Sequence, residues 1–318
     1  MLRLWSFLSG PRARNYPLVA LALILLTAPC AQASESGQSA YLPGFQDTLA
    51  GYQPPPGSYF KQILYFYNGS AGKVVGEGNV KVGLHESLPI QFSMVNQVTK
   101  TRLLGSNYAW ALIVPFAEPE LTGQIVTPLG NISRSRSVSA LSDIVIVPIM
   151  LGWHNGRSHQ KAWLNIYTPT GEYNVQSFVN TGLNRWAVEF DYAYTFLDMK
   201  TGCEFDIATG YTFNFENPAT NYTSGQEFHV DFAAMKHYSA ALAVGAVGYA
   251  FIQTTPDSGS GAKLGAFEGR TFALGPIVTY NTKVGSVPIG LTGKYYEEFA
   301  VSKRFEGHSY WLNISAAF

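Results

Sequence analysis

Three consecutive segments of the chain alternate strictly between apolar and polar positions. In residues 186–196, one face carries Trp186, Val188, Phe190, Tyr192, Tyr194 and Phe196, and the other carries Ala187, Glu189, Asp191, Ala193 and Thr195. Residues 204–213 and 227–232 repeat the arrangement, with rings and branched side chains opposite carboxylates. A period of two is typical of β-strands. Because unpaired charge is too costly to bury in a soluble core, the pattern predicts a wall with one apolar and one wet face.

The last strand-like segment, residues 308–318, has the same character and ends on a ring. One face carries Tyr310, Leu312, Ile314, Ala316 and Phe318, and the other is polar apart from Trp311. Outer-membrane barrels have strands that are apolar outside and polar inside. The sequence therefore predicts an all-β fold, an antiparallel transmembrane outer-membrane β-barrel.

Strand-like segments and the connections between them indicate the topology. We expect twelve strands, near residues 58–67, 89–98, 107–127, 143–153, 160–169, 185–196, 203–214, 225–235, 240–253, 270–280, 287–299 and 308–318. Dividing the third segment at its prolines and adding residues 78–84 would give fourteen, which stays an alternative. Long connections (130–141, 170–184, 214–224, 254–269, 299–306) alternate with short ones (154–159, 197–202, 236–239, 281–286). Such barrels have long external loops and short periplasmic turns, so the rhythm places Phe318 in the periplasm.

Composition agrees with this fold. Charged residues make up 13% of the chain and aromatic residues 14%, and the formal net charge is zero. The low charge suits an apolar outer surface, and the neutral balance gives no reason to expect nucleic acid binding. Only Cys203 lies beyond residue 33, which argues against an intramolecular disulfide and a thiolate metal site.

The N-terminus has the pattern of an export signal. Three arginines precede an uncharged apolar run over residues 16–28, and Ala31-Gln32-Ala33 supplies small residues for cleavage. We expect residues 1–33 to be a signal peptide and residues 57–318 to form the barrel. Residues 34–56 contain Pro54-Pro55-Pro56, which cannot donate to a strand ladder. This segment is either a periplasmic tether or a plug folded into the lumen.

Two interpretations remain open for the polar inner face. Its carboxylates could form a selective lining of a narrow wet pore. They could instead form a bracing network with Arg185, His229 and Lys294, because neighbouring carboxylates need partners. Most rings are expected to face lipid, whereas Trp163 and Tyr167 are candidates for stacking on an aromatic solute.

Catalysis and metal binding find little support in the sequence. The histidines are scattered, and His308 and Ser309 are adjacent, so on a strand they point to opposite faces. No histidine or cysteine cluster is visible along the chain. We therefore predict neither an enzyme nor a bound metal or cofactor.

Several motifs along the chain carry a family resemblance. They are Tyr41-Leu42-Pro43-Gly44, Pro54-Pro55-Pro56-Gly57-Ser58-Tyr59, Ser142-Asp143-Ile144, Tyr167-Thr168-Pro169-Thr170-Gly171-Glu172-Tyr173, Gly182-Leu183-Asn184-Arg185-Trp186 and Leu274-Gly275-Pro276. In order and spacing the chain resembles the outer-membrane family described as transporters of the meta-pathway of phenol degradation. The resemblance implies passive uptake of small hydrophobic or aromatic compounds through the bacterial outer membrane.

The residues predicted to contact solute are Asp143, Trp163, Tyr167, Arg185, Glu189, Asp191, Glu204, Asp206, Glu227, His229 and Asp231. Expected partners are outer-membrane lipid, the solute itself, and the barrel-assembly machinery, which would read the strand that ends in Phe318. Two alternatives remain: a non-conducting structural or stress-responsive envelope barrel, and an outer-membrane lipid-modifying enzyme.

Overall fold

The computed structural model describes residues 38–74, 81–127, 130–177, 179–262 and 267–318. These residues belong to one compact unit. The predicted signal peptide, residues 1–33, lies outside the described residues. Within the described part of the chain, no helix is long and apolar enough to cross a membrane.

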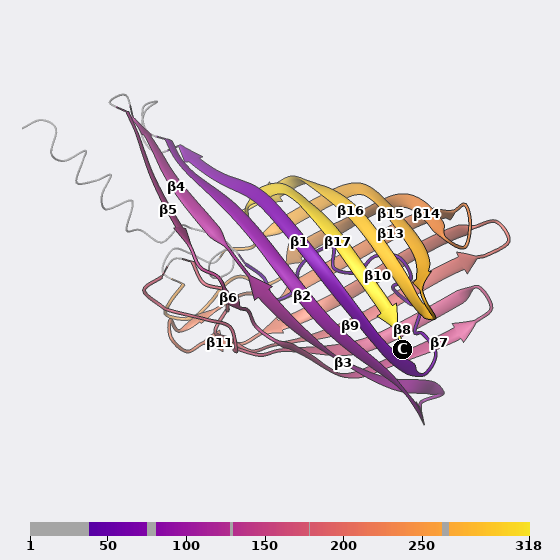
Figure 1. The fold of residues 1–318 in the computed structure, drawn as a ribbon. Coiled ribbons are helices and arrows are strands. Elements are labelled where there is room, and N and C mark those ends of the chain that lie inside the picture. Colours follow the sequence, from indigo (N-terminus) through magenta and orange to yellow (C-terminus); the bar gives the residue numbers. More distant parts are fainter. Residues whose placement is uncertain (1–37, 75–80, 128–129, 178, 263–266) are drawn as a thin grey trace, which may run out of the picture. The chain divides into compact units, whose positions relative to one another are not determined.

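Twelve antiparallel strands close the barrel, as the sequence predicts (Figure 1). They are β1 (Gly57–Val74), β2 (Lys81–Leu103), β3 (Ser106–Ala117), β7 (Val145–Asn155), β8 (Ser158–Tyr167), β9 (Ala187–Asp198), β10 (Cys203–Asn214), β13 (Glu227–His237), β14 (Leu242–Gln253), β15 (Arg270–Val284), β16 (Val287–Ser302) and β17 (Glu306–Ala317). Each strand pairs with its neighbours along the chain, and β1 pairs with both β2 and β17. The wall therefore has no free edge, which satisfies the backbone within a membrane.

Shorter strands lie outside the closed wall. The hairpin of β4 (Glu120–Thr127) and β5 (Gly130–Ser137) pairs with the start of β2, and β6 (Ala140–Leu141) pairs with the end of β3. β11 (Glu216–Asn217) and β12 (Tyr222–Thr223) pair with each other. The alternative with fourteen strands is wrong, because residues 120–127 leave the wall instead of adding to it.

Some boundaries differ from the sequence-based expectation. β1 and β2 continue well past residues 67 and 89, because their polar ends pair with each other and β2 also pairs with β4. The expected loop at 299–306 shrinks to residues 303–305, and the expected loop at 130–141 contains β5. Hydrophobic alternation marks only the part of a strand that crosses lipid. Polar extensions of a strand therefore look like loops in the sequence.

The two faces of the wall follow the alternation. In β9, Phe190 and Tyr192 are exposed while Glu189 and Asp191 are buried, and in β17 Leu312 is exposed while Trp311 is buried. Both ends of the barrel meet at one rim, where Ser58 and Phe318 exchange backbone hydrogen bonds of 3.2 and 2.9 Å. Short turns share that rim, for example Leu104-Gly105 with positive φ at both residues. In the bacterial outer membrane this rim is the periplasmic one.

Candidate functional site

An N-terminal segment, residues 38–56, lies against inward-facing side chains of β9, β10 and β13 (Figure 1). We call these side chains the acidic wall, which consists of Glu189, Asp191, Glu204, Asp206, Glu227, His229 and Asp231. Each is exposed by 5% or less. A backbone without strand partners must find acceptors for its N–H groups, and the carboxylates of the wall supply them.

Asp231 holds the first part of the segment. The backbone N–H groups of Gly44 and Gln46 donate to its carboxylate at 3.1 and 3.0 Å, and the Tyr41 hydroxyl donates to it as well. The Tyr41 ring stacks on the His229 imidazole with 3.5 Å between centroids. Burial and the neighbouring Asp231 raise the pKa of the Tyr41 hydroxyl well above its ordinary value. Tyr41 therefore remains a hydrogen-bond donor.

Glu204 and Asp206 hold the next turn of the segment. Glu204 accepts from the Thr48 hydroxyl and from the backbone N–H of Leu49 at 2.9 Å. Asp206 accepts from the backbone N–H of Ala50 at 3.2 Å. Carboxylates that receive backbone N–H groups make stronger hydrogen bonds than neutral acceptors.

At Gly51 the segment touches the backbone of the wall itself. Its N–H donates to the Thr195 hydroxyl at 2.8 Å. A Cβ at this position would lie 2.7 Å from the carbonyl oxygen of His159 and 2.7 Å from the amide nitrogen of Thr195. Only glycine allows so close an approach.

A buried ion pair ties the segment to the opposite side of the barrel. Lys294 on β16 donates to Asp47 at 2.8 Å and to the carbonyl of Gly44 at 2.6 Å, and Asn313 on β17 donates to Asp47 at 3.2 Å. Burial favours a protonated Asp47, but the charges of Lys294 and Lys61 outweigh it and hold the pKa of Asp47 below its ordinary value. Asp47 is therefore ionised at neutral pH.

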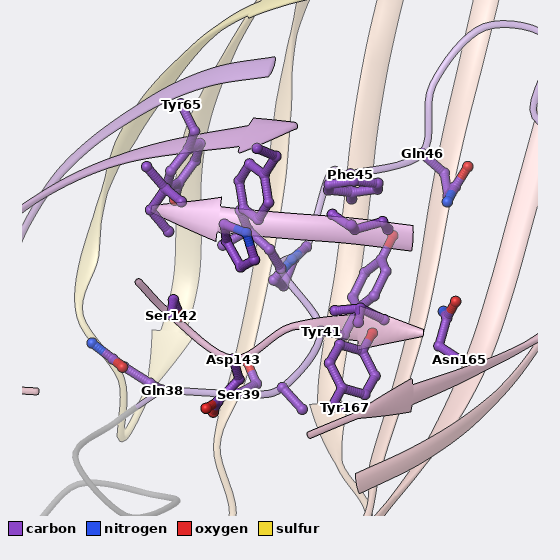
Figure 2. Close-up of a pocket in the computed structure, with 18 of the residues that line it drawn as sticks. Gln38, Ser39, Tyr41, Phe45, Gln46, Tyr65, Ser142, Asp143, Asn165 and Tyr167 are labelled. Carbon is purple, nitrogen blue, oxygen red and sulfur yellow. The ribbon is translucent and has the colours of Figure 1, made fainter. Parts of the chain in front are cut away.

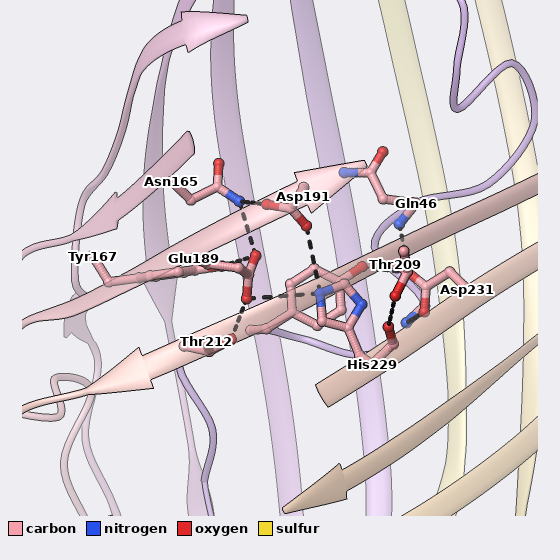
Figure 3. A network of polar contacts seen from close by, with 11 residues as sticks. Gln46, Asn165, Tyr167, Glu189, Asp191, Thr209, Thr212, His229 and Asp231 are labelled. Atoms are coloured by element: carbon pink, nitrogen blue, oxygen red, sulfur yellow. Dashed lines mark hydrogen bonds and ion pairs between the residues drawn. The ribbon is translucent and has the colours of Figure 1, made fainter. Parts of the chain in front are cut away.

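Glu189, Asp191 and His229 form a cluster (Figure 3). The Tyr41 ring stacks on its imidazole. Asn165 donates from its amide to Glu189 and to Asp191, both at 2.9 Å, and the Tyr167 hydroxyl donates to Glu189 at 3.0 Å. His229 Nε2 lies 3.5 Å from Asp191 Oδ1 and 3.7 Å from Glu189 Oε2. The cluster therefore has fixed carboxylates and an imidazole that approaches both.

A cavity of about 360 Å³ lies on the other side of the segment (Figure 2). We call the inner faces of β1, β2, β3, β7 and β8 that line it the cavity wall. The apolar lining includes Phe45, Tyr65, Tyr67, Leu88, Ile90, Phe92, Ile113, Val145, Val147, Met150, Trp163 and Tyr167. Apolar and aromatic walls with a few polar groups are typical of sites for small organic molecules.

Two predicted residues mark the outer part of this cavity. Asp143 accepts from the backbone N–H groups of Gly171 and Leu183 at 2.8 and 2.7 Å, which pins the loop between β8 and β9. Burial raises the pKa of Asp143, and those two N–H groups oppose the shift. Arg185 is 2% exposed and donates through Nε to Asn214 at 3.4 Å. Its two terminal nitrogens make no hydrogen bond within the described part of the chain.

The eleven residues predicted to contact solute are all buried, at 8% exposure or less. The structure separates them into two groups. Asp143, Trp163, Tyr167 and Arg185 line the cavity, whereas the other seven form the acidic wall. The bracing interpretation names Arg185, His229 and Lys294. The structure pairs His229 with wall carboxylates, but Lys294 with Asp47 and Arg185 Nε with Asn214.

Sequence reasoning missed the residues that the N-terminal segment contributes. Tyr41 and Phe45 both line the cavity, and Phe45 also packs edge-on against Phe92 with 5.5 Å between centroids. The apolar rings in an otherwise polar segment are the signal that could have found them. Near the rim, Ser158 pairs with Tyr194 at 2.9 Å and His154 with His159 at 2.9 Å.

Comparisons with solved structures identify the same architecture. The COG4313 outer membrane channel from Pseudomonas putida F1 matches with a TM-score of 0.60 and 14% identity, covering 84% of this chain and 97% of that one. The β domain of the Bordetella autotransporter BrkA matches with a TM-score of 0.45, 8% identity, and 83% and 100% coverage. A Pseudomonas aeruginosa FadL homologue matches with a TM-score of 0.35, 6% identity, and 82% and 88% coverage. Only the first supports the fold, and at this identity it supports the fold alone.

Comparisons of the sequence identify a family as well as a fold. No curated protein matches the chain significantly. A family model described as "Putative MetA-pathway of phenol degradation" matches residues 64–314, which includes all or part of every strand of the closed wall. The chain belongs to this family of phenol-degradation outer-membrane proteins.

Proposed function

We propose that this barrel is a channel for the passive uptake of small hydrophobic or aromatic compounds across the outer membrane. The observation that carries the proposal is the cavity beside the N-terminal segment, whose volume of about 360 Å³ falls in the range of small-molecule sites. Its rings, among them Trp163 and Tyr167, offer faces and edges to an aromatic solute. The family description names phenol degradation and is consistent with such a solute.

Polar groups in the cavity would orient a solute that carries a hydroxyl group. Arg185 presents terminal N–H groups that no described residue accepts, and it lines the same cavity as Tyr167. A phenol oxygen at Arg185 would accept these donors while its ring lies among the aromatic side chains. This arrangement would retain phenols and exclude sugars, whose many hydroxyls would lose their hydration without finding partners.

The N-terminal segment supports a second candidate, a non-conducting envelope barrel. Its many hydrogen bonds to the acidic wall favour a lumen that stays filled. For transport, the N-terminal segment must either leave an open path through the lumen or move aside.

Uptake can be tested in vesicles whose outer leaflet is lipopolysaccharide, since a phospholipid bilayer alone lets phenol pass. Ile113→Trp would fill the cavity, whereas Leu112→Trp adds the same ring to the neighbouring exposed position on β3. We expect the unmodified protein and Leu112→Trp to speed phenol entry equally, and Ile113→Trp to lose the acceleration. Entry no faster than in empty vesicles would contradict uptake and favour the structural barrel.

We also propose that the barrel-assembly machinery reads the last strand. Phe318 is 74% exposed, and the outward residues Tyr310, Leu312 and Ile314 precede it on β17. Phe318→Lys should lower the amount of protein in the outer membrane without changing the refolding of purified chain in detergent. Equal membrane levels of the two proteins would contradict this role.

A further inference from the structure

We propose that Glu189, Asp191 and His229 bind a divalent transition-metal ion such as Zn²⁺ on the inner face of the barrel. The register of three strands creates the site. Asp191 on β9 lies opposite Gly210 on β10, and Gly210 lies opposite His229 on β13. Because Gly210 has no side chain, the side chains of Asp191 and His229 can extend over it and approach each other.

The distances within the cluster are longer than hydrogen bonds and suit ligands of one ion. His229 Nε2 lies 3.5 Å from Asp191 Oδ1 and 3.7 Å from Glu189 Oε2, whereas N–H···O bonds measure about 2.7–3.2 Å. A tetrahedral ion with bonds of about 2.0–2.2 Å separates its ligand atoms by about 3.3–3.6 Å. One ligand atom from each residue can be chosen so that all three lie within 4.8 Å of one another.

Two of the three atoms that face the centre of the cluster, one on His229 and one on Asp191, have no hydrogen-bond partner among the described residues. His229 is fully buried, and neither ring nitrogen has a hydrogen-bond partner among the described residues. Asp191 Oδ1 has none either. Buried polar groups are nearly always hydrogen-bonded. An imidazole that faces two carboxylates at ion-pair distance, without a close hydrogen bond to either, is an arrangement that one shared cation would complete.

Hydrogen bonds from neighbouring side chains fix the orientation of both carboxylates. Asn165 donates to Asp191 Oδ2 and to Glu189 Oε1, and Tyr167 donates to the same Glu189 oxygen. Thr212 donates to Glu189 Oε2. Metal sites depend on such outer hydrogen bonds to hold their ligands in place.

Gly210 and Tyr41 both lie against the cluster. A Cβ on residue 210 would lie 2.1 Å from His229 Nε2 and 2.5 Å from Asp191 Oδ1, so any other residue would push these ligand atoms apart. On the lumen side the Tyr41 ring stacks on the imidazole. An imidazole with two carboxylates is a mixed nitrogen and oxygen set that suits Zn²⁺ and neighbouring first-row ions.

The test uses full-length mature protein, purified in detergent and treated with a chelator. Co²⁺ and Zn²⁺ are titrated by absorption and calorimetry, because tetrahedral Co²⁺ has a distinct visible spectrum. We expect one equivalent to bind, with a tetrahedral Co²⁺ spectrum. Affinity should fall by about 100-fold or more in His229→Gln and by about 10-fold or more in Asn165→Leu, which removes two outer hydrogen bonds and no ligand.

His154→Gln is the matched control, because His154 belongs to a different histidine pair on β7 and β8. It should bind like the unmodified protein. The shift in gel mobility on boiling checks that each variant forms a closed barrel, and Asp191→Asn replaces His229→Gln if the latter fails to fold. No binding by the unmodified protein, or equal binding by the cluster variants, would overturn the proposal and leave His229 as an ion-pair partner of the two carboxylates.

Discussion

The acidic wall and the cavity wall are built from the same alternating strands, but the N-terminal segment contacts them differently. Along the acidic wall, Asp231, Glu204 and Asp206 accept its backbone N–H groups. Along the cavity wall the inward residues are mostly rings and branched side chains, for example Phe92 and Trp163, and a cavity remains. An irregular backbone needs acceptors more than it needs apolar contact. The distribution of carboxylates thus decides on which side of the lumen the segment lies.

The largest expected effect comes from breaking the ion pair between Lys294 and Asp47. Lys294→Met leaves Asp47 buried without its nearest counter-charge, and removing one partner of a buried pair costs about 3–5 kcal/mol. The N-terminal segment should then detach from β16 and leave its docked position in the lumen. Labelling of Ala50→Cys by a membrane-impermeant maleimide, in a Cys203→Ser background, measures this detachment.

Lys294→Met should also reverse the pH dependence with which the N-terminal segment docks in the lumen. In the unmodified chain the pKa of Asp47 is lowered, so its contribution is complete above the ordinary carboxyl pKa of about 3.9 and is lost as the pH falls through the lowered value. In Lys294→Met, burial favours protonated Asp47, so docking should weaken as the pH rises. Labelling rates with the same pH trend in both proteins would contradict the assigned role of the ion pair.

A smaller loss is expected when the acidic wall itself is changed. Asp231→Ala removes the acceptor of Tyr41, Gly44 and Gln46. Unlike Lys294→Met it leaves no buried charge without its nearest counter-charge, so we expect a net loss of about 1.5–3 kcal/mol, the range of a hydrogen bond to a charged group. The Ala50→Cys labelling rate should rise, and so should the ion conductance in a planar bilayer. Unchanged conductance together with faster labelling would show that the segment does not limit the pore.

A substitution in the cavity wall should weaken phenol binding and leave the docking of the N-terminal segment unchanged. Trp163→Ala removes a ring that lines the cavity, and an aromatic contact is worth about 0.5–1.5 kcal/mol beyond its buried area. Phenol binding, measured by calorimetry, should weaken several-fold while Ala50→Cys labelling stays constant. If labelling changes and phenol binding does not, the two walls do not have separate roles.

The smallest effect is expected outside the barrel. Phe190 is 59% exposed and lies on the outer face of the same strand as Glu189 and Asp191. Phe190→Leu keeps an apolar lipid contact and should change neither labelling nor phenol binding. A measurable change in either would mean that the outer and inner faces of β9 are coupled.

Much of the fold could be predicted from the sequence, because a period of two assigns each side chain to a face. The twelve strands, the inward direction of Glu204 and Asp206 and the shared rim of Phe318 and the short turns all follow from alternation and loop length. The polar ends of β1 and β2 did not follow, since backbone pairing beyond the lipid leaves no hydrophobic trace.

The candidate site depended on tertiary structure. Glu189, Asp191 and His229 are recognisable in the sequence as inward residues, but only the register of three strands places Asp191, Gly210 and His229 in one row. The position of residues 38–56 against the acidic wall is likewise a matter of long-range contacts. Local pattern determines which way a side chain points, whereas its neighbours depend on how distant strands align, and no local period encodes that alignment.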